Sequence, residues 1–228
     1  MAVHRRSLPP LAAALAVLAA APAAVAVPVM PGAPATPLPG ISLADTPALA
    51  GTILADVVTP WVSAIDPQYG FPGAQGELES RVVRETDSGT LDFYWRVSVD
   101  AVSYPNYVPT QLLIEALPLS GFGTGLAYDA DYRTDGLGNT APSGALASGS
   151  SLAWLFDPSS FGPGRSSFFL VVRSYATGYD SSALAELGAS SIATFAPAAV
   201  PEPAGAALAL AGLLALVAGA RRRTGSPQ

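Results

Sequence analysis

The sequence has no cysteine and no lysine, and its single histidine, His4, lies near the amino terminus. Without cysteine the chain forms neither disulfides nor thiolate metal sites. The absence of lysine, and of histidine after residue 4, excludes catalytic triads, serine–lysine dyads, Schiff-base chemistry and histidine zinc sites from the rest of the chain. Carboxylate chemistry is what remains, and we predict that the protein is not an enzyme.

Positive charge is scarce as well. All eleven basic residues are arginine, and five of them lie in the terminal segments, at Arg5, Arg6, Arg221, Arg222 and Arg223. Residues 27–199 contain six arginines against sixteen Asp and Glu, a formal charge of −10. Nucleic-acid binding depends on cationic side chains that displace counterions from phosphates. The chain is therefore predicted to have no nucleic-acid partner.

The first 26 residues have the three parts of a secretory signal peptide. A basic start at Arg5 and Arg6 is followed by an apolar run over residues 11–21, which is too short to span a bilayer. Ala24-Val25-Ala26 then provides the small-x-small pattern of a cleavage site. We expect export through the Sec translocase and removal of residues 1–26 by signal peptidase, with a cut after Ala23 as the alternative.

The carboxyl-terminal segment, residues 200–228, also has three parts. Val200-Pro201-Glu202-Pro203 comes first, residues 204–220 carry no charge, and Arg221, Arg222 and Arg223 follow. A helix over residues 204–220 would be about 25 Å long, marginally enough to cross a membrane. Because arginines beside a span stay on the cytoplasmic side, we predict a transmembrane helix with residues 221–228 as a basic cytoplasmic end.

Pro-Glu-Pro before a short Ala/Leu/Gly span and an arginine cluster resembles the PEP-CTERM sorting signal of Gram-negative bacteria. The resemblance covers residues 200–228. It implies recognition by exosortase, an inner-membrane cysteine transpeptidase, and cleavage at or near Pro201-Glu202-Pro203. It also implies a protein that is anchored in the inner membrane before processing and then reaches the cell surface, often beside exopolysaccharide and biofilm matrix.

Between these two ends the sequence predicts a leader and one folded domain. Residues 27–50 contain six prolines, so we expect an extended or disordered leader, and the domain is expected to cover residues 51–197. The clearest strand is Leu91–Val99, where apolar and polar side chains alternate with a period of two. The turn signal Asp87-Ser88-Gly89 joins it to a strand at residues 78–85, which predicts a hairpin.

Further strands are expected at residues 111–117, 125–133, 151–156, 166–175 and 191–195, and a short helix at residues 182–187. About seven short strands separated by clusters of Gly, Pro, Ser and Asp favour an all-β domain. We predict a single β-sandwich of immunoglobulin-like or jelly-roll kind, whose strand order does not follow from the sequence.

An Asp-rich segment is the candidate metal site. Asp129, Asp131 and Asp135 precede Gly136, and such a segment can supply oxygen ligands to calcium. The spacing departs from an EF-hand loop, because Arg133 occupies the place of a third ligand. A strand edge followed by an Asp-Gly turn is the alternative.

Two kinds of carbohydrate site are also considered. Aromatic side chains near turns could stack on sugars, as in carbohydrate-binding modules, or could cap the core. These residues are Tyr69, Phe71, Tyr104, Tyr107 and Tyr179. Two carboxylates can hydrolyse a glycoside, and the available acids are Glu77, Glu79, Glu85, Asp87 and Glu115.

The expected function is that of an exported structural or adhesive protein of the cell surface or the biofilm matrix. Its expected partners are signal peptidase, exosortase and, in the matrix, exopolysaccharide. A carbohydrate-binding module is the alternative, and a glycoside hydrolase is a third hypothesis.

Overall fold

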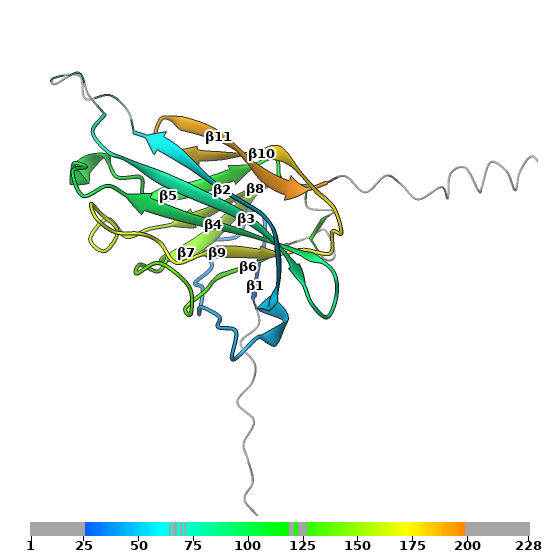
Figure 1. Ribbon diagram of the computed structural model, residues 1–228. Helices are drawn as coiled ribbons and strands as arrows, with labels where there is room; N and C mark the ends of the chain where they lie inside the picture. Colours follow the sequence, from blue (N-terminus) through cyan, green and yellow to red (C-terminus); the bar gives the residue numbers. More distant parts are fainter. Residues whose placement is uncertain are drawn as a thin grey trace, which may run out of the picture.

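Antiparallel β-strands make up most of the computed structural model, which describes residues 26–63, 65, 68, 70, 72–118, 121–122 and 127–198 (Figure 1). The strands form one sheet of six and one of five. In pairing order, the first sheet contains β1 (Val27–Val29), β6 (Tyr128–Tyr132), β9 (Leu170–Arg173), β4 (Leu91–Val99), β3 (Gln75–Glu85) and β2 (Gly51–Val62). The second contains β11 (Ser190–Pro197), β10 (Tyr179–Leu187), β5 (Gln111–Glu115), β8 (Ser151–Leu155) and β7 (Gly144–Ser148). Two short 3-10 helices are η1 (Pro47–Leu49) and η2 (Pro105–Tyr107).

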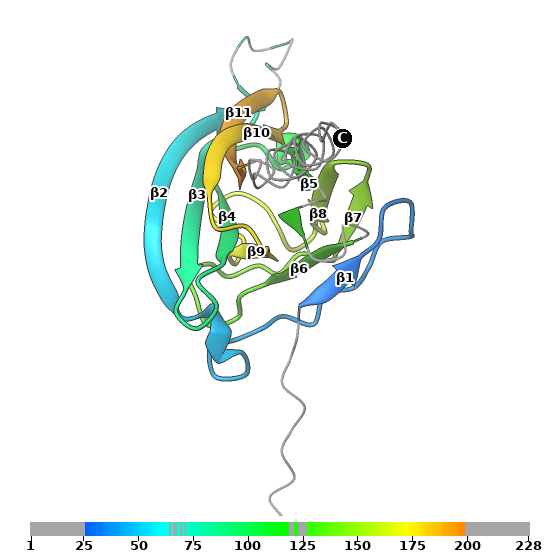
Figure 2. The ribbon, with the colours of Figure 1, turned by 90° about the vertical axis from the view of Figure 1, so that its right-hand side faces the viewer.

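The two sheets face each other as curved layers (Figure 2). Along one side β2 lies close to β11, and along the other β1 lies close to β7. Ser190 fastens the first side, because its hydroxyl accepts from the N–H of Val62 at 2.9 Å and donates to the carbonyl of Val62 at 3.0 Å. The prediction of an all-β fold is therefore confirmed, in a sandwich-like arrangement of two antiparallel sheets.

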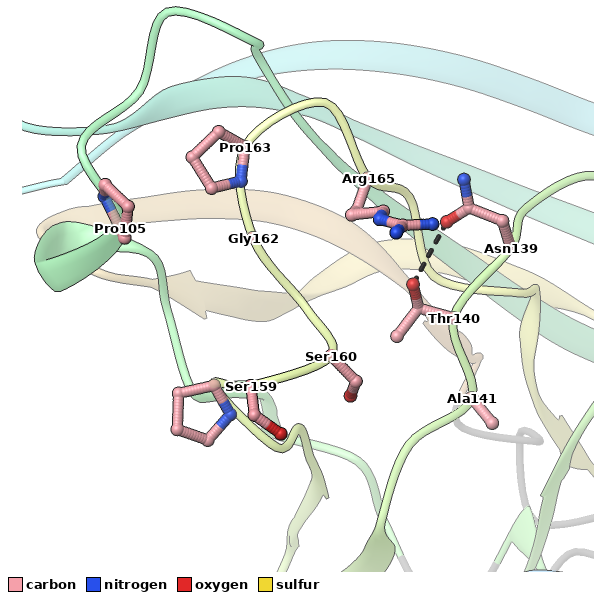
Figure 3. A pocket seen from close by; sticks show the side chains of 10 residues that line it. Pro105, Asn139, Thr140, Ala141, Ser159, Ser160, Gly162, Pro163 and Arg165 are labelled. Carbon is pink, nitrogen blue, oxygen red and sulfur yellow. Dashed lines mark hydrogen bonds between the residues drawn. The ribbon is translucent and has the colours of Figure 1, made fainter.

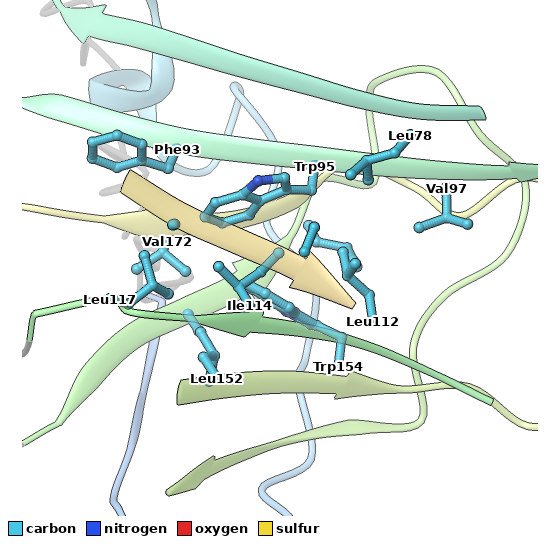
Figure 4. Close-up of a cluster of buried hydrophobic side chains, with 14 of the residues drawn as sticks. Leu78, Phe93, Trp95, Val97, Leu112, Ile114, Leu117, Leu152, Trp154 and Val172 are labelled. Atoms are coloured by element: carbon cyan, nitrogen blue, oxygen red, sulfur yellow. The ribbon is translucent and has the colours of Figure 1, made fainter. Parts of the chain in front are cut away.

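Large apolar side chains from both sheets fill the space between the layers (Figure 4). The ring centroids of Trp95 on β4 and Trp154 on β8 lie 5.5 Å apart, and both rings are buried. Leu78 from the first sheet and Ile114 from the second belong to the same cluster. Each such side chain contributes about 1.5–3 kcal/mol to folding through removal of its apolar surface from water.

A chain of hydrogen bonds crosses this core. The indole N–H of Trp95 donates to the hydroxyl of Thr194 on β11 at 2.7 Å. The Thr194 hydroxyl donates in turn to the hydroxyl of Ser80 on β3 at 2.9 Å. Buried polar groups cost free energy unless they find partners, so this chain of bonds allows Trp95 to lie in the core and links the two sheets.

The hairpin prediction is confirmed. β4 covers Leu91–Val99 as predicted, and it pairs antiparallel with β3 through the turn at Asp87-Ser88-Gly89. Gly89 has φ of 72°, a left-handed conformation that glycine adopts at little cost. Strands β5, β6, β8, β9 and β11 also lie within or across the residues predicted for them.

The helix predicted at residues 182–187 is wrong, because these residues belong to β10. Ala183, Ala185 and Leu187 are fully buried, whereas Leu184 between them is 40% exposed. This alternation is that of a strand with one face on the core. The helical propensity of Ala, Leu and Glu is overridden by pairing with β5 and β11.

Strand β2 was not predicted, because it lies at the edge of the first sheet and is mostly exposed. Val57 and Val58 are 48% and 54% exposed, so the burial pattern lacks a clean period of two. Pro60 also argues against a strand in the sequence, but an edge strand tolerates proline where the missing N–H would face outward.

The prediction that residues 27–50 lie outside the folded domain is wrong. The segment is extended, but β1 pairs with β6, and Thr36 then bridges to Ala145 of β7. Ile41 and Leu49 are buried against the outer face of the first sheet. Prolines are compatible with this extended edge position. The free side of an edge strand forms no ladder hydrogen bonds and so does not need the N–H that proline lacks.

The connections gather at two opposite ends of the sheets. We use the name loop end for the connections 63–74, 100–110, 156–169 and 188–189. They lie together because Val62 pairs with Gln75, Gln111 pairs with Leu155, and Val62 bonds to Ser190. Figure 1 shows β2 running to this end at the left and β11 running to the opposite end at the right. The chain therefore leaves the sheets, after Pro197, at the end opposite the loop end.

Substitution of Thr194 tests the bonds that cross the core. Thr194→Val keeps the shape but leaves the buried N–H of Trp95 without its acceptor, so we expect the free energy of unfolding to fall by about 1–3 kcal/mol. Thr194→Ser keeps the hydroxyl and should cost less. Urea unfolding followed by tryptophan fluorescence measures both, and an equal loss in the two variants would contradict the role of the hydroxyl.

Candidate functional site

Most residues of the predicted sorting and cleavage sites lie outside the described residues. These are Ala24, Val200, Pro201, Glu202, Pro203, Arg221, Arg222 and Arg223. No helix among the described residues is long and apolar enough to cross a membrane, and the predicted span at 204–220 is not among them. Ala26 is described, and it is buried with 3% of its surface exposed.

The structure does not bring Asp129, Asp131 and Asp135 together as calcium ligands. Asp131 accepts from the N–H groups of Gly40 at 2.9 Å and of Tyr132 at 2.8 Å. Asp135 pairs with Arg133 and accepts from the N–H of Leu43 at 2.6 Å. Among the described residues, no group of three or more acids or histidines is placed to hold a metal ion. Two of these aspartates instead bind the backbone of the N-terminal segment.

A row of charged side chains crosses the outer face of the first sheet, with one arginine beside three carboxylates. Arg173 on β9 is in register with Asp92 on β4 and with Asp129 on β6. Its guanidinium donates to the buried carboxylate of Glu85 at 2.8 Å. The single positive charge of Arg173 therefore interacts with three carboxyl groups, those of Glu85, Asp92 and Asp129.

Asp92 is fully buried within this row. One carboxyl oxygen, Oδ2, accepts from the hydroxyl of Tyr94 at 3.4 Å, and the other, Oδ1, has no hydrogen-bond partner among the described residues. Burial, reinforced by the charge of Glu85, raises the pKa of Asp92 to about 8, although Arg173 acts in the opposite direction. Asp92 is therefore mostly protonated at pH 7.

Two of the acids considered for glycoside hydrolysis form structural ion pairs. Glu79 binds Arg81 and Arg96, each at 2.6 Å, and Glu85 binds Arg173. Arg81 and Arg96 also lie over the ring of Phe169, with guanidinium carbons 4.6 and 5.6 Å from its centroid. Glu79 thus bridges two arginines that cover an aromatic ring, with Asp56 as a second partner of Arg81, and this arrangement gives Glu79 a stabilising role.

The N-terminal segment covers part of this outer face. Ile41 and Leu49 form a second buried cluster with Val83, Tyr94 and Val171 of the sheet below them. A pocket of about 240 Å³ remains beside the cluster, lined in part by Tyr94, Arg133 and Phe169. The segment therefore buries an apolar patch of the outer face that includes Tyr94, the hydrogen-bond partner of Asp92.

A larger pocket, of about 540 Å³, lies at the loop end (Figure 3). Its lining is polar and rich in hydroxyl groups, from Thr140, Ser159 and Ser160. Asn139 accepts from the hydroxyl of Thr140 at 3.0 Å, as Figure 3 shows, and from the N–H of Ser166 at 3.2 Å. The loop between β8 and β9 thus meets the one between β6 and β7 across this pocket.

Arg165 supplies the charge of this pocket. Four of the domain's six arginines, Arg81, Arg96, Arg133 and Arg173, are held in ion pairs with Asp or Glu. Within the described part of the chain, Arg84 and Arg165 form no ion pair. Arg165 therefore places a guanidinium group, without an ion-pair partner among the described residues, in a pocket lined by hydroxyl groups. The sequence alone does not reveal this, because pairing of the other arginines depends on strand register.

Of the aromatic residues considered for sugar stacking, Tyr104 and Tyr107 lie beside Gly73 at the loop end, whereas Tyr179 lies at the opposite end, beside Pro197. Tyr104 is 46% exposed, whereas Tyr179 packs edge-on against Phe195. The ring of Tyr107 lies so close to Gly73 that a Cβ there would meet it at 2.1 Å. Tyr69 and Phe71 lie outside the described residues.

Comparison with protein-family models, with curated proteins and with solved structures gives no match to this chain. Its function must therefore be argued from its own residues and their arrangement.

The protonated state of Asp92 predicts how stability depends on pH. Because the pKa is raised from 3.8 to about 8, the folded protein keeps a proton that the unfolded chain releases. The stability associated with this proton is full below pH 4 and is lost as the pH rises to about 8, by up to about 1.4 kcal/mol per pH unit. Asp92→Asn should raise the melting temperature at pH 8 and raise it much less at pH 5.

Asp87→Asn is the matched control, since Asp87 is exposed in the turn between β3 and β4. The test compares the melting temperatures of the unchanged protein, Asp92→Asn and Asp87→Asn from pH 5 to pH 8. A curve for Asp92→Asn that runs parallel to that of the unchanged protein would show that Asp92 is already ionised in the folded state.

Proposed function

We propose that this chain is an exported structural or adhesive protein of the cell surface or extracellular matrix of a Gram-negative bacterium. The observation that carries the proposal is the order of Pro201-Glu202-Pro203, an uncharged segment at 204–220 and Arg221, Arg222 and Arg223. In this proposal signal peptidase removes residues 1–26, and the tail holds the protein in the inner membrane. Exosortase then cuts at or near the Pro-Glu-Pro motif, and the protein moves to the surface.

The arrangement of the domain supports this proposal. The chain leaves β11 at the end opposite the loop end, so a tail that follows Pro197 would hold the loop end away from the membrane. The two antiparallel sheets are also compatible with the finer class proposed for the domain, a β-sandwich of immunoglobulin-like or jelly-roll kind. Such domains present their connecting loops at the ends of the sheets.

The processing step is tested by intact mass. The protein purified from its native host should lack both residues 1–26 and Arg221, Arg222 and Arg223. The same chain produced in a bacterium without exosortase should lose the signal peptide but keep the three arginines. A native mass that still includes them would overturn the proposal of exosortase processing.

Binding of a matrix polysaccharide is the second candidate function, and the pocket at the loop end favours it. Its hydroxyl and amide groups match the polar groups of a sugar, and Arg165 matches a carboxylate. An acidic saccharide, one containing uronate units, is the ligand class that uses both. On an acidic surface such a ligand needs an arginine without an ion pair, and of the two in the described residues, Arg84 and Arg165, only Arg165 lines this pocket.

Substitution of Arg165 tests this second function. Arg165→Ala should weaken binding of uronate oligosaccharides at least about tenfold, as expected for the loss of a charge-assisted hydrogen bond. Arg84→Ala is the matched control, because Arg84 is exposed and unpaired within the described residues but lies outside the pocket. Calorimetry with acidic and neutral oligosaccharides measures both, and equal affinities of the two variants would exclude the pocket as the site.

A further inference from the structure

Asp131 is a buried carboxylate with half of its hydrogen-bonding capacity unused. Its side chain is fully buried, and Oδ1 accepts from the N–H groups of Gly40 and Tyr132. The other oxygen, Oδ2, has no partner among the described residues. No arginine of the described residues forms an ion pair with this acid, and burial raises its pKa to about 6. A buried carboxylate without a cation is costly.

The carboxylate of Asp131 lies where two pieces of the N-terminal segment meet along one edge of β6. Val27 of β1 pairs with Ala130, and the N–H of Ile41 donates to the carbonyl of Tyr132 at 2.9 Å. Position 131 falls between these two contacts. The main chain of Asp131 faces the opposite neighbour, β9, since Asp131 pairs with Val171 and the N–H of Arg133 donates to the carbonyl of Phe169, just before β9. Only the side chain of Asp131 reaches this edge, where it holds Gly40.

Ala26 occupies the remaining place at this edge. Because Val27 is opposite Ala130 in an antiparallel pair, residue 26 is opposite Asp131. Ala26 and Asp131 also share the outer face of the sheet, since Val29 and Ala130 belong to the core between the sheets whereas Ala26 belongs to the outer cluster. Cross-strand neighbours on one face lie about 4.5–5.5 Å apart at their Cβ atoms.

We propose that Asp131 is a binding site for the α-ammonium group of Val27, which signal peptidase creates when it cuts after Ala26. The inference rests on the proposed export of the chain. Hydrolysis of the bond between Ala26 and Val27 consumes one water and releases a carboxylate on Ala26 and an amine on Val27, which takes up a proton near neutral pH. The new ammonium stands beside Oδ2, in the space that Ala26 leaves.

This pairing gives the cleavage a structural consequence. Before the cut, Asp131 is a buried acid that forms no ion pair among the described residues, and β1 is joined to β6 by backbone pairing. After the cut, a charge-assisted bond joins β1 to β6 and completes the hydrogen bonding of the carboxylate. Val27 is thereby fixed at the start of the first sheet, and the N-terminal segment that covers part of the outer face is secured at its first residue.

The absence of lysine makes the test specific, because the α-amine of Val27 is the only amine in the processed chain. The full exported chain is purified, and its mass is checked for a start at Val27. It is then acetylated with N-hydroxysuccinimide acetate at pH 7. An ion pair that raises the pKa of the α-amine by about one unit slows acetylation about tenfold. We expect this slowing in the unchanged protein and its loss in Asp131→Asn.

Acetylation should also lower the melting temperature of the unchanged protein by several degrees and leave that of Asp131→Asn unaltered. Asp135→Asn is the matched control, since Asp135 also binds the N-terminal segment, at Leu43, but lies away from residue 26. It should acetylate as slowly as the unchanged protein. A chain released from a fusion to begin at Ala26 keeps Asp131 but displaces the amine by one residue, and it should acetylate rapidly. This chain supplies the comparison if Asp131→Asn does not fold.

Three results would overturn the pairing. Equal acetylation rates in the unchanged protein and in both displaced or neutralised chains would show that the amine is free. A mature mass that begins at Ala24, after a cut at Ala23, would place the amine away from Asp131 and leave the proposed export intact. A mass that still includes Met1 would overturn the pairing together with the proposed export.

Discussion

The packing of Trp95 between the sheets is the contact on which the rest of the structure depends. Its ring meets Trp154 of the second sheet, and its N–H reaches Thr194 at the far edge of that sheet. Because Thr194 is also bonded to Ser80 beside Trp95, the relative position of β11 and the first sheet is fixed by directional bonds as well as by apolar contact. This position sets which connections meet at the loop end and where the chain emerges after β11.

The sequence predicts the parts of the fold whose local patterns agree with their burial. The apolar residues of Leu91–Val99 alternate because one face lies on the core between the sheets, although Asp92 and Tyr94 on the other face are buried as well, and Asp87-Ser88-Gly89 has the residues that its turn requires. β10 and β2 were missed for opposite reasons. The Ala, Leu and Glu residues of β10 favour a helix until neighbouring strands pair with it, and the exposed apolar residues of β2 conceal its period. Residues 27–50 were predicted to lie outside the domain because of their prolines, but proline is also compatible with an edge strand of the sheet.

The candidate sites follow from register, which a single sequence does not reveal. The shortage of cations is visible in the composition, but which arginine meets which acid is decided by strand pairing. Arg173 is placed between Asp92 and Asp129 by its two neighbours, and Glu79 is placed beside Arg96 by the hairpin. Within the part of the chain that the structure describes, the same pairing leaves both Arg165 and Asp131 without an ion-pair partner. The three aspartates predicted as one metal site have other partners, because Asp129 lies opposite Arg173 whereas Asp131 and Asp135 bind the backbone of the N-terminal segment.

Strand β2 has a consequence for molecules that stand close together on a surface. A long open edge with exposed valines is a template on which another chain can add a strand. Here Ser190 already occupies both main-chain groups of Val62, Pro60 has no N–H to donate, and a bulge interrupts the pairing between Ile53 and Ala55. These features shorten the regular, unpaired stretch of β2 and so limit the addition of a strand from another copy of the chain.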